Sequence, residues 1–267
     1  MAKIIVSLAQ MRIAAGDVKR NFATVEKLTA EAARRGSNLV VFPELWSTGY
    51  TLDRSRELAD QLNSGIFAQL SHIATQHKIS IVGSVLEKRG MEVANSATFF
   101  APTGRMMGVY RKIHLFRLMK EDQYLLPGES PLVLDLPWGN TGMAICYDLR
   151  FPELFRRYAL EGAQMVIIPA EWPAERIEHW RTLLQARAIE NQFYIVATNT
   201  CGEILGTTFG GHSMIIDPWG KVLIEAGDEA GLFTVEIDLD RVAQIRERIP
   251  VFDDRRPELY EALDLKL

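Results

Sequence analysis

Cysteine is scarce in this chain, which has two cysteines, Cys146 and Cys201, among its 267 residues. Two thiols are too few for a disulfide framework or for a four-thiolate metal site. The five histidines also lack the spacing of a zinc-binding motif. We therefore expect no metal site, and the cysteines are left for chemistry or packing. For Cys201 we expect packing, or a place at the rim of a pocket.

Long hydrophobic runs and a large excess of one charge are missing as well. No apolar stretch approaches the roughly 20 residues that span a bilayer, and the opening MAKIIVSLAQ reads as a strand rather than a signal peptide. A net charge of -4 and a pI of about 5.8 give no broad attraction for nucleic acid or an anionic membrane. We expect a cytoplasmic protein that acts on a small molecule.

The composition is that of an ordinary globular domain, with 48% hydrophobic and 24% charged residues and no low-complexity linker. We therefore expect one domain over residues 1–267. Residues 250–267 lack a clear core pattern, so this tail is expected on the surface or crossing to another subunit. A Gly-x-Gly-x-x-Gly fingerprint after a strand is absent, which argues against a Rossmann nucleotide binder.

Short apolar runs typical of buried strands alternate with amphipathic helical patterns. The strand-like runs lie at residues 4–9, 39–42, 79–86, 143–146, 165–169 and 194–199. The helical patterns lie at residues 21–36, 65–77, 153–163 and 176–192. Two further segments, 101–111 and 215–226, have hairpin turn residues. This alternation predicts a layered α/β fold with mixed sheets.

The tetrapeptide Phe-Pro-Glu-Leu occurs twice, and we expect its two glutamates to differ in role. Glu44 follows a strand-like run, at the strand end where ligands of α/β sheets collect, so it is a catalytic candidate. Glu153 follows Pro152 in the predicted first turn of a helix, where a carboxylate complements the positive helix end. We expect Glu153 to be structural.

Cys146 ends a strand-like run shortly before that helix. A cysteine at such a turn is exposed, and the positive helix end lowers its pKa. The backbone N–H of Tyr147 would then be placed to hold an oxyanion. The competing interpretation is that Cys146 is a small buried apolar residue. Lys112 is a further candidate, in a basic cluster before a long loop, although such a cluster is commonly a solvated strand edge.

Three segments together resemble the signature blocks of the nitrilase superfamily of carbon–nitrogen hydrolases. They are FPE at 42–44, YRKIHLF at 110–116 and AICYDLRFPE at 144–153, and the resemblance extends to about residue 238. The CYD sequence and the segment from 179 to 199 are similar to the amidase branch, especially omega-amidases. True nitrilases more often have Trp-Glu after the cysteine.

The resemblance implies a four-layer α-β-β-α sandwich with two six-stranded sheets, and a homodimer or larger homo-oligomer paired through helices. It also implies a hydrolysis that needs no cofactor. By the same resemblance Cys146 is the nucleophile, Glu44 the general base and Lys112 the oxyanion stabiliser. Glu121 fits the second glutamate of the family, in the loop after the lysine.

The substrate pocket is less defined by the sequence. Glu171 and Trp172 follow a strand end and are expected to line the acyl pocket. The distal carboxylate of an omega-amidase substrate needs a cation, for which the candidates are Arg150, Arg176 and Arg117. An inward-pointing Glu171 would repel such a substrate.

The sequence leaves several functions open. The leading one is hydrolysis of a small linear amide through a cysteine thioester. Hydrolysis of an N-carbamoyl compound or a nitrile would use the same site, and a catalytically silent scaffold is an alternative of another class. A glutamine amidotransferase would need a synthetase domain, for which this chain is too short.

Overall fold

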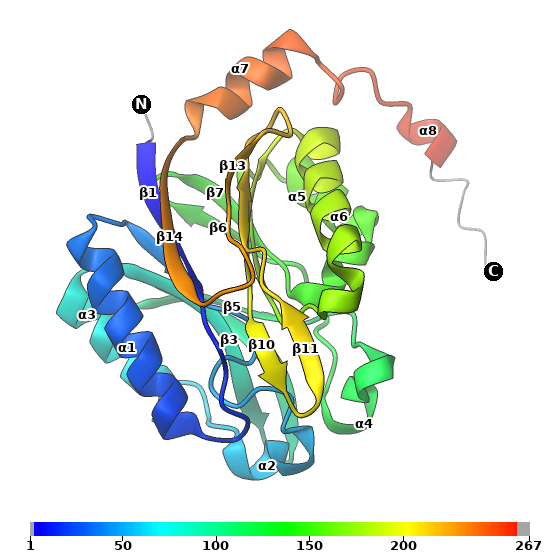
Figure 1. The fold of residues 1–267 in the computed structure, drawn as a ribbon. Coiled ribbons are helices and arrows are strands. Elements are labelled where there is room, and N and C mark those ends of the chain that lie inside the picture. The colour runs from blue at the N-terminus through cyan, green and yellow to red at the C-terminus, as the bar shows by residue number, and fades with distance from the viewer. Residues whose placement is uncertain (1–2, 261–267) are drawn as a thin grey trace.

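The computed structural model describes residues 3–260, which form two six-stranded sheets packed face to face (Figure 1). The first sheet has the order β14-β1-β2-β3-β4-β5, and parallel pairing joins β2 to β1 and β3. Its strands are Lys3–Gln10 (β1), Leu39–Val41 (β2), Ser80–Arg89 (β3), Glu92–Phe100 (β4), Met106–Arg111 (β5) and Gly231–Asp238 (β14).

The second sheet has the order β13-β12-β9-β8-β7-β6, with parallel pairing of β7, β8 and β9. Its strands are Val133–Leu136 (β6), Gly139–Met143 (β7), Met165–Ala170 (β8), Tyr194–Asn199 (β9), Met214–Ile216 (β12) and Val222–Glu225 (β13). A separate hairpin is formed by Cys201–Ile204 (β10) and Thr207–Gly210 (β11).

Helices cover the outer faces of both sheets. Figure 1 shows α1 and α3 on the first sheet and α5 and α6 on the second. The longer helices are Val18–Arg34 (α1), Gly65–His77 (α3), Pro152–Leu160 (α5), Ile177–Asn191 (α6) and Asp240–Arg248 (α7). The short ones are Ser55–Leu58 (α2), Glu121–Tyr124 (α4) and Pro257–Tyr260 (α8), with 3-10 turns at Leu52–Arg54 (η1), Arg117–Met119 (η2), Cys146–Arg150 (η3) and Ala174–Arg176 (η4). The predicted four-layer sandwich is confirmed.

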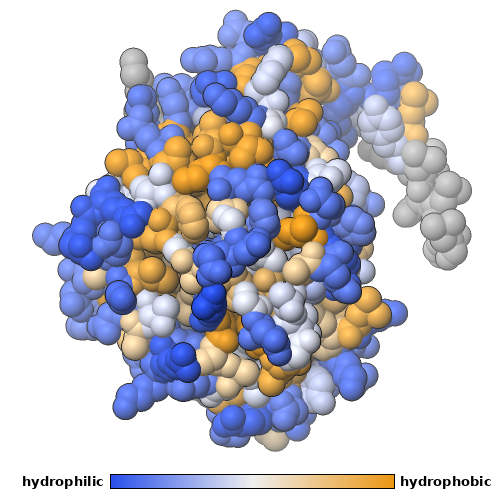
Figure 2. Space-filling model, in the orientation of Figure 1, coloured by the Kyte–Doolittle hydropathy of each residue, from blue (hydrophilic) through white to orange (hydrophobic). Residues whose placement is uncertain are grey.

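The apolar patterns produce this layering because each sheet is buried on both faces. The larger core fills the space between the sheets and the layer under α5 and α6, whereas a second core lies between the first sheet and α1 and α3. Local signals also agree, since the Asp17 side chain accepts a hydrogen bond from the N–H of Arg20 and so caps α1. Figure 2 shows further apolar side chains on the surface where β13 and β14 lie, the edge strands of the two sheets.

Both predicted hairpins are present, as the antiparallel pairs β4–β5 and β12–β13. One strand prediction is wrong in its position, because β7 ends at Met143 and does not reach Cys146. The chain turns out of the sheet here, and Cys146 adopts a left-handed φ of 45°. No helix among residues 3–260 is long and apolar enough to cross a membrane.

The predicted tail begins after the helix α7. Phe252 is half-buried, and the guanidinium groups of Arg156 and Arg246 lie 5.3 and 5.0 Å from its ring centroid. Farther along, α8 stands apart from the four layers (Figure 1). Residues 261–267 of the predicted tail lie outside the described residues, and its crossing to another subunit stays a prediction.

Candidate active site

The two sheets bring four candidate residues together from the ends of four strands. Glu44 follows β2, Lys112 follows β5, Cys146 follows β7 and Glu171 follows β8. All four are buried, with exposed fractions between 0% for Lys112 and 5% for Cys146. Carboxyl ends of neighbouring parallel strands meet at one edge of a sheet, and here the corresponding edges of two facing sheets adjoin.

Lys112 joins two of the carboxylates. Its Nζ lies 2.7 Å from Oε1 of Glu44 and 2.6 Å from Oε1 of Glu121. Burial by itself would lower the pKa of Lys112, but the charges of Glu121 and Glu44 outweigh burial and raise this pKa well above its usual value. The ammonium form therefore persists, and it supplies a fixed positive charge inside the site.

Glu44 is held by three donors. Its Oε1 accepts hydrogen bonds from Lys112 Nζ and, at 2.8 Å, from Nδ2 of Asn95. Its Oε2 accepts the backbone N–H of Glu171 at 2.9 Å. Asn95 was missed in the sequence, where a polar residue inside the strand EVANSATFF was a signal that could have found it.

Glu121 is also held by three donors, which confirms that the structure brings it to the other predicted residues. Besides Lys112, Tyr50 Oη donates to its Oε1 at 2.6 Å and the N–H of Phe116 donates to its Oε2 at 2.7 Å. Burial raises the pKa of Glu121, and Lys112 opposes this rise. Tyr50 was missed in the sequence, where it follows Glu44 by six residues in the same loop.

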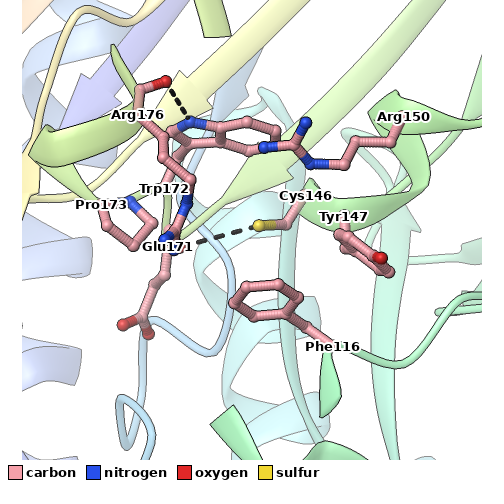
Figure 3. Close-up of a pocket in the computed structure, with 8 residues that line it drawn as sticks. All are labelled: Phe116, Cys146, Tyr147, Arg150, Glu171, Trp172, Pro173 and Arg176. Carbon is pink, nitrogen blue, oxygen red and sulfur yellow. Dashed lines mark hydrogen bonds between the residues drawn. The ribbon is translucent and has the colours of Figure 1, made fainter. Parts of the chain in front are cut away.

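Cys146 lies at a tight elbow between β7 and η3. Its φ of 45° is in the left-handed region, which costs a non-glycine residue about 1–3 kcal/mol. The thiol Sγ donates to the backbone carbonyl of Glu171 across 3.6 Å. This elbow points the thiol at the segment after β8, as Figure 3 shows.

Two expectations for Cys146 are wrong. The residue is buried rather than exposed, and its pKa is raised well above the usual value rather than lowered. Burial is the main cause of the raised pKa. The negative charge of Glu44 raises this pKa further, and its effect is larger than the opposing effect of the Lys112 ammonium. The helix α5 begins only at Pro152, so its positive end does not adjoin the thiol. Cys146 is therefore a neutral thiol that needs a base.

Asp148 organises the backbone of this elbow. Its Oδ2 accepts the hydroxyl of Tyr110 at 2.7 Å and the N–H of Ile145 at 2.9 Å. Its Oδ1 accepts the N–H of His114 at 3.0 Å and lies 2.7 Å from the Nδ1 of the same residue. The His114 ring stacks on Phe151 with centroids 3.5 Å apart.

A cavity opens beside the thiol (Figure 3). It is lined by Phe116, Cys146, Tyr147, Arg150, Glu171, Trp172, Pro173 and Arg176. The Arg150 guanidinium lies 4.9 Å from the Trp172 ring centroid, and that of Arg176 lies 5.4 Å from the Phe116 ring. Arg117 lines a neighbouring groove instead. Two of the three predicted arginines therefore flank the thiol.

Glu171 lines this cavity with its backbone. Figure 3 shows its carboxyl group pointing away from Cys146 and from the two arginines of the cavity. Burial raises the pKa of the Glu171 carboxyl well above its ordinary value, and the charge of Glu44 acts in the same direction. The second glutamate of FPEL, Glu153, is exposed in the first turn of α5, as predicted for a structural residue.

Cys201 is the other cysteine of the chain. Cys201 is buried in β10, and burial raises its pKa to about 11. This thiol is therefore protonated and packed, as expected. Within residues 3–260, no three His, Cys, Asp or Glu side chains are grouped so that they could hold a metal ion.

The fold and this cluster define a hydrolase of carbon–nitrogen bonds. Residues 5–247 match the family described as carbon-nitrogen hydrolase, and the chain belongs to that family. It is accordingly a hydrolase of non-peptide carbon–nitrogen bonds, and the predicted superfamily is confirmed.

Individual relatives are amidases. The chain is 42% identical over 256 residues to the 2-oxoglutaramate amidase of Bacillus subtilis (strain 168), covering 96% of this chain and 98% of the relative. A carbon-nitrogen hydrolase structure from Helicobacter pylori G27 has a TM-score of 0.93 at 27% identity, over 99% of both chains. A glutamate-to-glutamine mutant of the amidase from Nesterenkonia sp. AN1, with acrylamide added to its active-site cysteine, has a TM-score of 0.86 at 28% identity, covering 97% of this chain and 99% of that chain.

Proposed function

We propose that this enzyme hydrolyses the terminal amide of a small dicarboxylic acid monoamide, releasing ammonia and the dicarboxylate. The observation that carries the proposal is the buried cluster of Lys112, Glu44 and Glu121 beside the Cys146 thiol, at a cavity flanked by two arginines. The relative named 2-oxoglutaramate amidase supports a substrate that has a carboxylate at the end opposite the amide.

Acylation begins when Glu44 takes the proton of the Cys146 thiol and Sγ bonds to the amide carbonyl carbon. The carbonyl oxygen becomes an oxyanion, which is stabilised by the Lys112 ammonium and the backbone N–H of Tyr147. Tyr147 is the second residue of η3, and first-turn N–H groups have no acceptor within their helix. Protonated Glu44 then donates to the nitrogen, the C–N bond breaks and ammonia leaves.

Deacylation uses the same groups on the resulting thioester. Glu44 takes a proton from water as the water oxygen bonds to the acyl carbon, and the second oxyanion is held as the first was. The C–S bond breaks, the proton returns to Sγ of Cys146, and the carboxylic acid leaves and ionises. Glu121 acts as a positioning residue, because it orients the Lys112 ammonium through a 2.6 Å contact.

The distal carboxylate is proposed to bind Arg150 and Arg176. Both side chains line the cavity, and guanidinium groups bind carboxylates through paired N–H donors. The Arg150 guanidinium also lies over the Trp172 ring, a cation–π contact that helps to hold the arginine in place. The Glu171 carboxyl points away from the cavity, which removes the repulsion that the sequence analysis considered.

The proposal is tested by ammonia release from dicarboxylic acid monoamides, simple aliphatic amides, N-carbamoyl amino acids and nitriles. We expect the highest kcat/KM on the monoamides and, for Cys146→Ala, a loss of turnover of at least about 10³-fold with the fold retained. Cys201→Ala is the matched control, because its thiol is also buried but lies in β10.

A loss of only a few-fold in Cys146→Ala would contradict the mechanism. Preference for N-carbamoyl compounds or nitriles would reassign the substrate while keeping the site. Silence of the wild type on all four classes would favour a binding scaffold.

We also propose that residues 1–267 act as a single domain in a cytoplasmic homodimer or larger homo-oligomer, with the tail from 250 on the surface or crossing to another subunit. The outer layer of α5 and α6 supports pairing, because Ile189 on α6 is 54% exposed. Trp219 and Ile249 are exposed apolar residues close to the same end of α6.

A further inference from the structure

The buried site contains more carboxyl groups than ammonium groups. Three carboxyl groups, those of Glu44, Glu121 and Glu171, surround a single ammonium, that of Lys112. Both Glu44 and Glu121 contact this ammonium, and each also accepts two further hydrogen bonds. The hydrogen-bonding capacity of these two buried carboxyl groups is therefore well satisfied, as is usual for buried polar groups.

The Glu171 carboxyl has none of these partners. Its side chain is 1% exposed, and within residues 3–260 neither Oε1 nor Oε2 has a hydrogen-bond partner. Apolar groups lie on one side of it, because a Cβ placed on Gly49 would be 3.9 Å from Oε1 of Glu171 and 3.4 Å from methyl carbons of Ile13 and Ile204. An isolated carboxylate in such a place is strongly disfavoured, whereas a neutral carboxylic acid is tolerated.

We propose that Glu171 carries a proton in the working enzyme and sets the alkaline limit of its activity, because its carboxyl is buried without a hydrogen-bond partner in the described part of the chain while its backbone contacts both Glu44 and Cys146. This inference rests on the proposed function and deepens it. Glu171 acts as a positioning residue, since its backbone contacts Oε2 of Glu44 and Sγ of Cys146 while its side chain points away from the cavity.

The charged groups around Glu171 favour this protonation state. Glu44 and Glu121 both oppose ionisation, and Lys112 alone favours it. Burial is the largest effect and raises the pKa of Glu171 in the same sense as the two carboxylates. Of the other titratable neighbours, Tyr50 and Cys146 have pKa values raised well above their usual values.

The segments after β1 and in β10 add no compensating charge. Cys201 is a protonated thiol, because burial raises its pKa to about 11. Arg12 reaches the surface and pairs with Glu229. Of the charged groups that act on Glu171, Lys112 is therefore the cation that could offset proton loss, and this ammonium already contacts Glu44 and Glu121. The charge of an ionised Glu171 would add to the negative charge of Glu44 and Glu121 and would oppose the developing oxyanion.

The test compares normalised pH profiles of kcat/KM on a dicarboxylic acid monoamide for the wild type, Glu171→Gln and Glu171→Met. Both variants remove the ionisable group at similar side-chain length. We expect the alkaline fall of kcat/KM to move upward by at least about one pH unit in both. Glu203→Gln is the matched control, since Glu203 is an exposed glutamate of β10, and its profile should coincide with that of the wild type.

A second measurement is independent of activity. The folded-state pKa of Glu171 is raised above its ordinary value of 4.5, so the folded chain holds this proton over a range in which the unfolded chain has lost it. The stability associated with Glu171 is therefore complete below the ordinary pKa and is lost as the pH rises toward the folded pKa. In urea unfolding between about pH 5 and about pH 9, we expect a shallower fall in the free energy of unfolding for Glu171→Gln and Glu171→Met than for wild type.

The inference would be overturned if both variants had the same pH profile of kcat/KM as the wild type and the same change of the free energy of unfolding with pH. A wild type that is inactive on all amides would contradict the proposed function instead, and the unfolding slopes alone would then decide whether Glu171 holds a proton. If one of the two variants does not fold, the other is sufficient for both measurements.

Discussion

Lys112 is the residue at which the buried charges of the site converge. Its ammonium lies within 2.7 Å of both Glu44 and Glu121, so its position depends on whatever holds those carboxylates. For Glu121 that support includes the hydroxyl of Tyr50, which also lies 3.5 Å from Lys112 Nζ. The Tyr50 hydroxyl can therefore influence the position of the Lys112 ammonium through Glu121.

Tyr50→Phe is expected to lower kcat by about tenfold, or about 1.4 kcal/mol, with little change in KM. The physical reason is that Glu121 loses a donor that lowers its pKa, and its hold on Lys112 loosens. Steady-state kinetics on the best amide measures this split between kcat and KM.

Tyr124→Phe is the matched control, because Tyr124 is a 38% exposed tyrosine of the adjacent α4. A rise in KM with kcat unchanged in Tyr50→Phe would instead assign Tyr50 to substrate binding.

At the scale of elements, two strained turns position the reactive groups. Cys146 and Leu45, the residue after Glu44, both have left-handed φ angles, of 45° and 40°. Neighbouring structure must hold such conformations in place. For Leu45 the N–H donates to the hydroxyl of Ser84 in β3, and for the Cys146 elbow the support is the fully buried Asp148.

Asp148→Asn is expected to reduce the free energy of unfolding by about 1–3 kcal/mol, because the amide presents a donor to groups that are themselves donors. The hydroxyl of Tyr110 and the N–H groups of Ile145 and His114 all donate to the carboxylate. Urea unfolding measures the loss, and kcat should fall with it because the elbow is distorted.

Asp135→Asn, at an exposed position of β6, is the control and should be nearly neutral. Equal stability of the two variants would mean that the network around Asp148 does not maintain the elbow.

At the scale of the whole molecule, the outer helical layer of α5 and α6 leaves large apolar side chains exposed. Ile189 on α6 and Trp219 in the β12–β13 turn are 54% and 47% exposed. A Cβ on Gly220 would lie 2.4 Å from Cγ1 of Ile189, so the turn adjoins this helix. Contiguous apolar surface of this kind marks an interaction site.

Ile189→Glu is expected to shift the proposed oligomer toward monomer, because a charge would be buried at the contact. Sedimentation velocity at several protein concentrations measures the change. Leu205→Glu is the control, since Leu205 is 67% exposed at the β10–β11 turn, away from α5 and α6. A monomeric wild type, or equal behaviour of both variants, would contradict pairing through this layer.

The sequence by itself determined the class of fold and four residues of the site. Strand and helix periods depend on local spacing of apolar residues, so the layers and both hairpins were predictable. The residues Glu44, Lys112, Cys146 and Glu121 were predictable because they lie within, or just after, contiguous signature segments.

Only the tertiary structure decided the hydrogen-bond partners, the burial and the electrostatic environment of those residues. The partners Asn95 and Tyr50 come from other strands and loops, and no local spacing indicates which carboxylate each will contact. The pKa of Cys146 is raised rather than lowered because burial and Glu44 act across the interface of two sheets. The direction of the Glu171 carboxyl likewise depends on packing between segments far apart in the chain, and it leaves a buried acid without a hydrogen-bond partner among residues 3–260.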